Sequence, residues 1–333
     1  MRALVHQAEG LVLKRDYPQP EPAHGEALIR VSLAGICNTD LEIVRGYMNF
    51  QGVPGHEFVG IVEKIAHQPG ASAPHALVGK RVVGEINAAC RKSTCSYCQR
   101  GMYTHCPERT TLGIANRNGA FADYLTLPIE NLHVVPNEVS DEEAVFVEPL
   151  AANFEMLEQV HLKPTDRVVV LGDGKMGQLA ARVLALTGCD VTIVGKHPEK
   201  LLLVEHLGIN ASLVEDVDEI TQHGRRRVDL VVECTGSEQG LEMALRLVRP
   251  AGTVILKSTV AASSNLHLAP IVIDEIRVQG SRCGPFAPAL RALAQHRIDV
   301  RPLISGRYTL DNALVAFDYA IQPGVLKVLV DAG

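Results

Sequence analysis

Four cysteines gathered in one short segment are the first residues of this chain whose types and spacing suggest chemistry. Their spacing is C-x4-C-x2-C-x7-C, within a loop rich in Ser, Thr and Arg. Four thiolates complete the tetrahedral coordination of Zn²⁺ and leave no open position for a substrate. The pattern therefore predicts a structural zinc site, with unpaired surface cysteines as the alternative. The predicted ligands are Cys90, Cys95, Cys98 and Cys106.

A second metal-type group is spread along the first half of the chain. Cys37 lies in the sequence GICNTD, and His56 precedes Glu57 in GHEFVG. A catalytic zinc keeps about three protein ligands and one exchangeable position, so its ligands come from distant stretches of sequence. We expect Cys37, His56 and one glutamate to hold such a zinc. A single histidine or glutamate with only a structural role is the alternative at each position.

A glycine-rich loop, GDGKMG at residues 172–177, directly follows an apolar stretch and begins a helical one. The first glycine permits the tight turn, the second lets the backbone approach a pyrophosphate, and the third lets helix and strand pack closely. The phosphates then lie at the N-terminus of a helix. A plain strand-to-helix turn is the alternative to dinucleotide binding. The predicted cofactor-binding residues of the loop are Gly172, Gly174, Lys175, Met176 and Gly177.

The residues after the second predicted strand of this region bear on the choice of dinucleotide. Gly195, Lys196 and His197 stand where an acidic residue would bind the adenosine ribose of NAD. The glycine leaves room for a 2'-phosphate, and the two basic side chains offer charge-assisted bonds. The sequence therefore predicts NADP, with NAD less favoured, unless both side chains point into solvent. Thr235, after a later strand, is also predicted to contact the cofactor.

Two textures along the chain indicate the elements that must position these residues. The first half contains short β segments broken by Gly and Pro, such as 27–32 and 58–63, which predict an antiparallel, barrel-like domain. From about residue 162, apolar strands alternate with helical stretches, a pattern typical of a parallel sheet covered on both faces. The predicted elements are 167–171, 175–187, 191–194, 198–207, 228–232, 241–248 and 253–256, followed by helices at 288–296 and 311–321 and a strand at 326–330.

Composition and charge exclude several classes of protein. A net charge of -6 and a pI near 6.1 argue against nucleic acid or an anionic membrane as partner, because both require a basic surface. The N-terminal residues do not resemble a signal peptide, and no run of apolar residues is long enough to span a bilayer. Cysteines beside metal-type partners indicate a reducing compartment. We expect a cytoplasmic enzyme with a small-molecule substrate.

Together the sequences GICNTD and GHEFVG resemble the medium-chain zinc-dependent alcohol dehydrogenases, and FVEPL at 146–150 is similar to their polyol and threonine dehydrogenase branch. The resemblance covers essentially the whole chain. It implies an α/β fold with a GroES-like β-barrel catalytic domain, residues 1–149 and 285–333, and a Rossmann doubly wound parallel-sheet domain, residues 150–284. It further implies an active site between the domains and a homodimer or homotetramer.

The resemblance also assigns roles near the expected catalytic zinc. Glu148 stands where the alcohol dehydrogenases have a second cysteine ligand, and Glu57 can exchange onto the metal, so either glutamate could be the resting ligand. Thr39 matches a hydroxyl that relays the alcohol proton, with a helix N-cap as the alternative role. Asp40 would orient a metal ligand. Lys327 matches a basic position near the pyrophosphate, with a solvated surface lysine as the alternative.

Several positions depart from the pattern of the family. Glu42 replaces a histidine that ends the proton relay in many relatives, which leaves the final proton acceptor open. Lys257 and Ser258 replace smaller residues near the nicotinamide. Residues 47–50 lie where relatives place substrate-pocket residues, although loop packing explains them equally well.

The function expected from these observations is hydride transfer between a secondary alcohol, polyol or sugar, or the matching carbonyl, and NADP. Zinc would act as a Lewis acid on the alcohol oxygen and the nicotinamide would accept the hydride. One alternative is a zinc-free quinone or enone reductase on the same scaffold, which would not retain Cys37, His56 and both glutamates. The other is a non-catalytic NADP-sensing binding protein, which would need only the four-cysteine cluster and the glycine loop.

Overall fold

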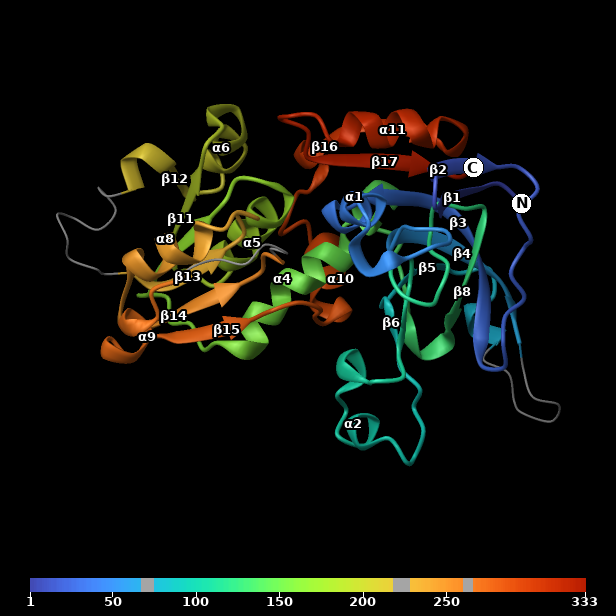
Figure 1. Cartoon of the computed structure of the whole chain (residues 1–333), viewed down its shortest axis with the longest axis horizontal. Coiled ribbons are helices and arrows are strands. Elements are labelled where there is room, and N and C mark those ends of the chain that lie inside the picture. Colours follow the sequence, from blue (N-terminus) through green and yellow to red (C-terminus); the bar gives the residue numbers. More distant parts are fainter. Residues whose placement is uncertain (67–74, 218–227, 260–265) are drawn as a thin grey trace. The chain divides into compact units, whose positions relative to one another are not determined.

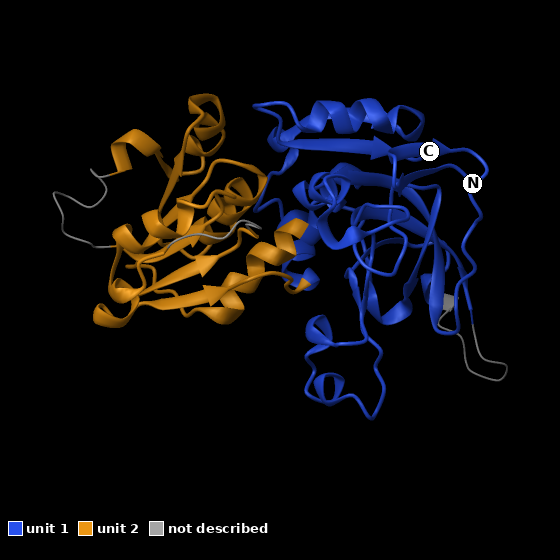
Figure 2. Ribbon diagram, viewed as in Figure 1, with its two compact units in different colours: residues 1–148, 286–333 blue, residues 149–285 orange. Residues whose placement is uncertain are grey.

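The computed structural model describes residues 1–66, 75–217, 228–259 and 266–333, and divides into two compact units (Figure 2). Unit 1 comprises residues 1–148 and 286–333, and unit 2 comprises residues 149–285.

Unit 1 is built on a mainly antiparallel sheet of the strand order β16-β17-β3-β4-β5-β9, with β8 also paired to β3. Buried Val, Ile, Leu and Ala side chains of these strands form its core. The strands are β3 (Glu26–Ile36), β4 (Glu57–Ile65), β5 (Arg81–Gly84), β8 (Tyr124–Pro128), β9 (Leu132–Val134), β16 (Ile304–Thr309) and β17 (Lys327–Asp331). Smaller pairs are β1 (Ala3–Gln7) with β2 (Gly10–Lys14), and β6 (Asn87–Ala88) with β7 (Thr110–Thr111).

Short helices connect these strands. The chain between β6 and β7 carries α2 and projects away from the sheet (Figure 1). The helices are α1 (Asn38–Val44), α2 (Ser96–Gln99), α3 (Asp141–Ala144), α10 (Phe286–Ala294) and α11 (Ala313–Ala320), and α4 (Val147–Gln159) leads into unit 2.

Unit 2 contains a six-stranded, entirely parallel sheet of the order β12-β11-β10-β13-β14-β15. Helices α4, α5 and α6 pack on one face of the sheet and α8 packs on the other (Figure 1). Each face has one apolar core beneath its helices. The elements are β10 (Arg167–Leu171), α5 (Lys175–Ala185), β11 (Asp190–Gly195), α6 (Pro198–Glu205), β12 (Asn210–Leu213), β13 (Val228–Glu233), α8 (Gly240–Leu247), β14 (Val248–Leu256), α9 (Ala269–Ile273) and β15 (Arg277–Gly280). This arrangement confirms the predicted fold class.

The strand order of unit 2 reverses direction between β10 and β13. Open α/β sheets bind ligands at such a switch point, beyond the carboxyl ends of the strands. The glycine loop follows β10 and Thr235 follows β13. Both predicted cofactor segments therefore flank the switch point.

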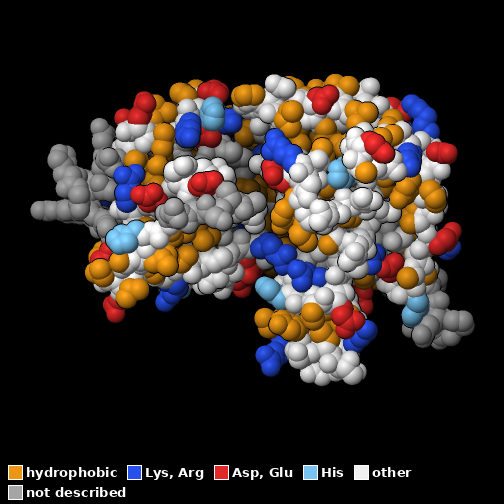
Figure 3. Space-filling view, viewed as in Figure 1, with side chains coloured by type: hydrophobic (Ala, Val, Ile, Leu, Met, Phe, Trp, Pro, Cys, Tyr) orange, Lys and Arg blue, Asp and Glu red, His pale blue; other side chains and the backbone are white. Residues whose placement is uncertain are grey.

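Hydrophobic side chains are exposed on unit 2 over α9 and β15, the strand at one edge of the sheet (Figure 3). The largest exposed fractions are 76% for Val272 and 77% for Ile273, and Leu268 and Val278 accompany them. Within the described ranges, no helix is both long and apolar enough to cross a membrane.

Candidate metal centres and cofactor site

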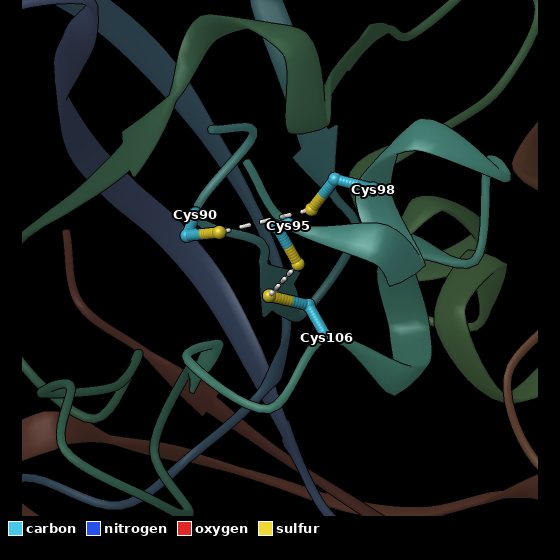
Figure 4. A group of neighbouring side chains, drawn as sticks. All are labelled: Cys90, Cys95, Cys98 and Cys106. Atoms are coloured by element: carbon cyan, nitrogen blue, oxygen red, sulfur yellow. Dashed lines mark hydrogen bonds between the residues drawn. The ribbon is translucent and has the colours of Figure 1, made fainter. Parts of the chain in front are cut away.

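The four clustered cysteines converge on one point in the projecting segment of unit 1 (Figure 4). The Sγ atoms of Cys90 and Cys98 are 3.8 Å apart, and those of Cys95 and Cys106 are 4.0 Å apart. Tetrahedral zinc with Zn–S bonds of about 2.3 Å places its sulfur ligands about 3.8 Å from one another. The spacing of the thiols thus fits a closed Cys₄ zinc site.

The pKa values of two thiols in this cluster also indicate that the cluster binds a cation. Burial is the largest cause that raises the pKa of the Cys98 thiol to about 12. Burial also disfavours ionisation of Cys106, but hydrogen bonds, led by those from the backbone of Cys90, lower its pKa to about 7. The thiols therefore do not all ionise by themselves near neutral pH, and bound Zn²⁺ would supply the charge that stabilises four thiolates.

Cys37, His56 and Glu57 form the second group of potential metal ligands, with ligand atoms all within 4.8 Å of one another. Cys37 directly follows β3 and Glu57 begins β4, and these two strands are adjacent and antiparallel. The turn before His56 is held tightly, because a side chain at Gly113 or Gly119 would collide with the carbonyl oxygen of Gly55. Sheet pairing and this turn therefore bring the three side chains together.

Asp40, fully buried on α1, holds two parts of this group in place. Its carboxylate accepts hydrogen bonds from the backbone N–H of Cys37 at 2.8 Å and of Gly55 at 3.1 Å. Its Oδ1 also lies 3.2 Å from Nδ1 of His56, an ion-pair contact without hydrogen-bond alignment. Because Nδ1 faces Asp40, Nε2 is the nitrogen left to bind a metal, as is usual for metal-ligating histidines.

Glu57 forms a buried ion pair with Lys327, which begins β17 in another part of the sequence. Both side chains are 1% exposed. Burial disfavours the charged lysine, but Glu57 and Cys37 raise the pKa of Lys327 above its ordinary 10.5. A Cβ added to Gly35 would lie 2.8 Å from the Glu57 carboxylate, so only glycine leaves room for this pair. The alternative prediction of a solvated surface lysine is wrong.

The charges of this group fit a divalent cation. Burial disfavours the imidazolium, yet Asp40 and Cys37 hold the pKa of His56 well above 6.5, which reflects the negative potential around it. Zn²⁺ and Lys327 together would balance the Cys37 thiolate, Asp40 and Glu57. Sulfur, imidazole nitrogen and carboxylate oxygen are the ligands of catalytic zinc.

Thr39 and Glu148 are also predicted to belong to this site, and the structure places the two differently from each other. Thr39 is the second residue of α1, and its hydroxyl lies 3.8 Å from Sγ of Cys37. Cys37 is the N-cap of α1, so the alternative role of Thr39 as the cap is wrong. Glu148, near the start of α4, makes an interaction of its own. Among the described residues, it is not part of the Cys37-His56-Glu57 group. Which glutamate binds the metal at rest stays a prediction.

The three glycines of the loop after β10 differ in their surroundings as dinucleotide binding requires. Gly172 has φ of +110°, and Gly177 has no room for a side chain, because a Cβ would lie 1.8 Å from the carbonyl oxygen of Gly172. Gly174, the N-cap of α5, has open space where its side chain would be. The open side of the loop thus lets a pyrophosphate approach the helix N-terminus. Lys175 and Met176 begin α5 at this point.

Asp173, within the same loop, is a residue that sequence reasoning missed. Its carboxylate accepts hydrogen bonds from the backbone N–H of Lys196 at 2.7 Å and of His197 at 2.8 Å, and contacts Nδ1 of His197 at 3.0 Å. Gly195 ends β11 directly beside it. The position after β11 therefore has a carboxylate nearby, although the strand supplies none. The preference for NADP stays a prediction.

Thr235 follows β13 on the other side of the switch point. Its N–H and hydroxyl both donate to the buried Glu233 carboxylate, at 2.7 and 2.6 Å, and its hydroxyl lies 3.0 Å from that of Ser237. Lys257, at the end of β14, donates to the carbonyl oxygen of Ala152 at 2.6 Å and to the Ser281 hydroxyl at 3.2 Å. These polar groups line the carboxyl edge of the sheet.

Comparisons with known proteins agree with this geometry. Residues 23–137 match the alcohol dehydrogenase GroES-like domain, and residues 176–296 match the zinc-binding dehydrogenase family. The chain is 30% identical to D-arabitol-phosphate dehydrogenase of Enterococcus avium, over 95% of this chain and 93% of that protein. It is also 30% identical to a sorbitol dehydrogenase of Halalkalibacterium halodurans, over 99% of both. A zinc-binding dehydrogenase of Sinorhizobium meliloti bound to NADP has the same fold, with 27% identity, a TM-score of 0.86, and 99% and 98% coverage.

The chain therefore belongs to the medium-chain zinc-dependent alcohol dehydrogenase family, in its polyol dehydrogenase branch. As a member of this family it is a zinc-dependent oxidoreductase that uses NAD(P). The predictions of family, of enzyme class, and of zinc and NAD(P) as cofactors are confirmed.

Proposed function

We propose that this enzyme oxidises a secondary hydroxyl of a polyol or sugar alcohol, or reduces the matching ketone, at the Cys37-His56-Glu57 group of unit 1. The observation that carries the proposal is this set of metal ligands, with His56 and Glu57 buried and Cys37 half-buried. Asp40 contacts His56, and Lys327 balances the charge of Glu57. When bound, Zn²⁺ supplies a Lewis acid at the alcohol oxygen and NAD(P) accepts the hydride.

The side chains of unit 1 have distinct tasks in this proposal. Cys37, His56 and one glutamate hold the metal, and Asp40 fixes the orientation of His56. The Thr39 hydroxyl, next to Cys37, accepts the proton of the substrate alcohol and passes it on. Lys327 holds the Glu57 carboxylate when that carboxylate is not on the metal, which keeps a buried charge compensated.

A polar hollow in unit 1 supports a polyol as the substrate class. It has a volume of about 390 Å³ and lies between the segment that follows α1 and the loop after β7. Four of its nine lining residues carry carboxamide side chains, and amides both donate to and accept from hydroxyl groups. Met48 and Asn49 have φ of 61° and 49°, the kind of backbone strain that gathers at functional sites. The amide residues of the lining are Asn49, Gln51, Asn116 and Asn118.

Two names among the relatives point the same way. The Enterococcus avium relative is an arabitol-phosphate dehydrogenase and the Halalkalibacterium halodurans relative a sorbitol dehydrogenase. The zinc-free reductase has no use for the three ligands and their buried counter-charges. The non-catalytic NADP-sensing protein would bind one zinc per chain, whereas this proposal requires two.

A panel of sugar alcohols and simple secondary alcohols, assayed by the absorbance of reduced nicotinamide with both NAD and NADP, tests the proposal. We expect the highest kcat/KM with a polyol that carries adjacent hydroxyls. Gln51→Leu should raise KM for that polyol more than KM for a monohydric alcohol. Equal use of polyols and monohydric alcohols by the native enzyme would contradict the proposed substrate class.

We further propose that the enzyme works in the cytoplasm as a homodimer or homotetramer. Thiolate zinc ligands persist in a reducing compartment. Among the described strands, β15 pairs only with β14, and its outer edge is flanked by exposed apolar side chains of α9. A second copy related by a twofold axis would cover this edge by pairing the two β15 strands antiparallel.

A further inference from the structure

The carboxylate of Asp173 lies where a side chain at the end of β11 would be. A Cβ added to Gly195 would stand 2.3 Å from Oδ2 and 2.5 Å from Cβ of Asp173. Gly195 is not among the residues with positive φ, so its backbone conformation does not itself require glycine. Space, and not backbone geometry, therefore makes residue 195 a glycine. The glycine loop delivers the acid that the strand lacks.

The hydrogen bonds of Asp173 fix its carboxylate in this position. Oδ2 accepts from the N–H groups of Lys196 and His197, at 2.7 and 2.8 Å. Among the described residues, Oδ1 contacts only Nδ1 of His197, at 3.1 Å. A carboxylate oxygen accepts two hydrogen bonds, so Oδ1 keeps capacity for a further donor. The side chain is 9% exposed, and the two backbone N–H groups hold its carboxylate in place.

We infer that Asp173 reads the adenosine ribose of the cofactor and selects against a 2'-phosphate. A ribose hydroxyl can donate to Oδ1, whereas a phosphate carries negative charge toward a buried carboxylate. The N–H groups of Lys196 and His197, which could otherwise bind a phosphate, already donate to Asp173. The inference deepens the proposed function, on which it rests, by naming the residue that sets the choice of cofactor.

Charge around the loop after β11 is more balanced than its sequence suggests. His197 contacts Asp173 through Nδ1, so its charge, when present, is compensated by that carboxylate. Lys196 is exposed and is the other basic residue of this loop. Asp173 thus opposes the NADP preference that the sequence of residues 195–197 predicts.

Calorimetric titration with two cofactor fragments tests this inference. AMP carries no 2'-phosphate, whereas adenosine 2',5'-bisphosphate does, and neither contains nicotinamide. In Asp173→Asn, which keeps the shape and one acceptor oxygen, we expect binding of the bisphosphate relative to AMP to improve by at least about tenfold. An unchanged ratio would overturn the inference. The proposed reaction could fail with every alcohol while this ratio still shifted, so the two failures are distinguishable.

The matched control is Asp190→Asn. Asp190 is at the amino end of β11, the strand that ends at Gly195. Asp190 is 51% exposed and pairs with Arg167 and Asn210, at the opposite edge of the sheet. Asp190→Asn also removes one negative charge from unit 2. It should leave the ratio of bisphosphate to AMP affinity within about twofold of the native value. An equal shift in both variants would mean that net charge alone is responsible, which also overturns the inference.

A second test moves the carboxylate from residue 173 to residue 195, so that the conclusion does not depend on Asp173→Asn alone. Gly195→Asp alone should destabilise unit 2, because the new side chain collides with Asp173. Asp173→Ala combined with Gly195→Asp returns the acid to the strand and should restore the native ratio of kcat/KM for NAD over NADP. If the double variant instead kept the ratio of Asp173→Ala, the position of the carboxylate would not control the choice of cofactor.

Discussion

Individual side chains in the metal site of unit 1 are held by buried charges that compensate one another. Asp40 contacts His56, and Lys327 pairs with Glu57, all four with exposures of 4% or less. Removal of one member leaves another charge buried and unpaired, which costs far more than loss of a surface pair. Residues that never touch the substrate therefore have measurable effects on metal retention and stability.

Asp40→Asn should lower zinc affinity at this site, activity, or both by about 10- to 100-fold, because the partner of a metal-bound histidine fixes its orientation and basicity. Zinc titration with a competing chelator and steady-state kinetics measure both effects. Glu63→Gln, which removes an exposed carboxylate of β4, is the control and should change neither. Native zinc affinity and rate in Asp40→Asn would contradict this role.

Lys327→Met should destabilise the protein by about 3 to 5 kcal/mol, because it leaves the Glu57 carboxylate buried without a partner. Adding Glu57→Gln to this variant should recover most of the loss, measured by urea denaturation. The pKa of Lys327 is raised above 10.5, so its contribution is present below that pH and is lost as pH rises through the folded pKa. Native stability of Lys327→Met would show that the pair contributes nothing.

Gly174→Ala and Gly177→Ala should have different effects although they lie in one loop. The methyl group at Gly174 enters open space and should weaken NAD(P) binding without loss of thermal stability. At Gly177 it would collide with the Gly172 carbonyl and should lower the Tm of unit 2. Fluorescence titration with NADH and thermal denaturation separate the two, and identical behaviour would refute the assigned roles.

Among the helices and strands, those with a local or periodic sequence pattern are the ones that the sequence predicts. The apolar runs and the glycine loop predict the strands and helices of unit 2, because a parallel sheet requires buried strands alternating with helices. The boundaries are less well predicted: the helix expected at 288–296 is α10, Phe286–Ala294, and strand 27–32 is only part of β3. The four cysteines are close in sequence, so their zinc site was predictable from spacing.

Long-range contacts account for most of what the sequence left open. Glu57 and Lys327 are 270 residues apart, and no periodicity relates them. Asp173 and Gly195 come together only because β10 and β11 are adjacent in the sheet. An aspartate between two loop glycines was the available signal, and it acquires meaning only when the strand order is known.

The exposed edge at β15 and α9 makes a prediction about assembly at this same scale. Ile273→Lys should shift the protein toward monomer, because it places a charge in an apolar surface that a second copy would cover. Light scattering over a range of protein concentrations measures the change. Leu202→Lys on α6, where the native side chain is 60% exposed, is the control and should leave the assembly intact. A native assembly in Ile273→Lys would exclude this edge as the interface.

For the whole molecule, the proposed reaction requires the metal ligands of unit 1 and the dinucleotide loop of unit 2 together. The two candidate zinc sites differ in kind, since one is closed by four thiolates and the other leaves a position for substrate. Brief treatment with a chelator should therefore remove one zinc and abolish activity before the fold is affected. Readdition of zinc alone should restore the rate. Loss of both ions in a single phase would contradict two distinct sites.

Metal content and activity of Cys37→Ser, measured beside the native enzyme, test the central claim most directly. We predict two zinc ions per chain in the native enzyme and about one in the variant, with hydride transfer nearly abolished and binding of NAD(P)H retained. Cys98→Ser should instead lose the other zinc, in the projecting segment of unit 1. A Cys37→Ser enzyme that kept two zinc ions and the native rate would contradict catalysis at the Cys37-His56-Glu57 group.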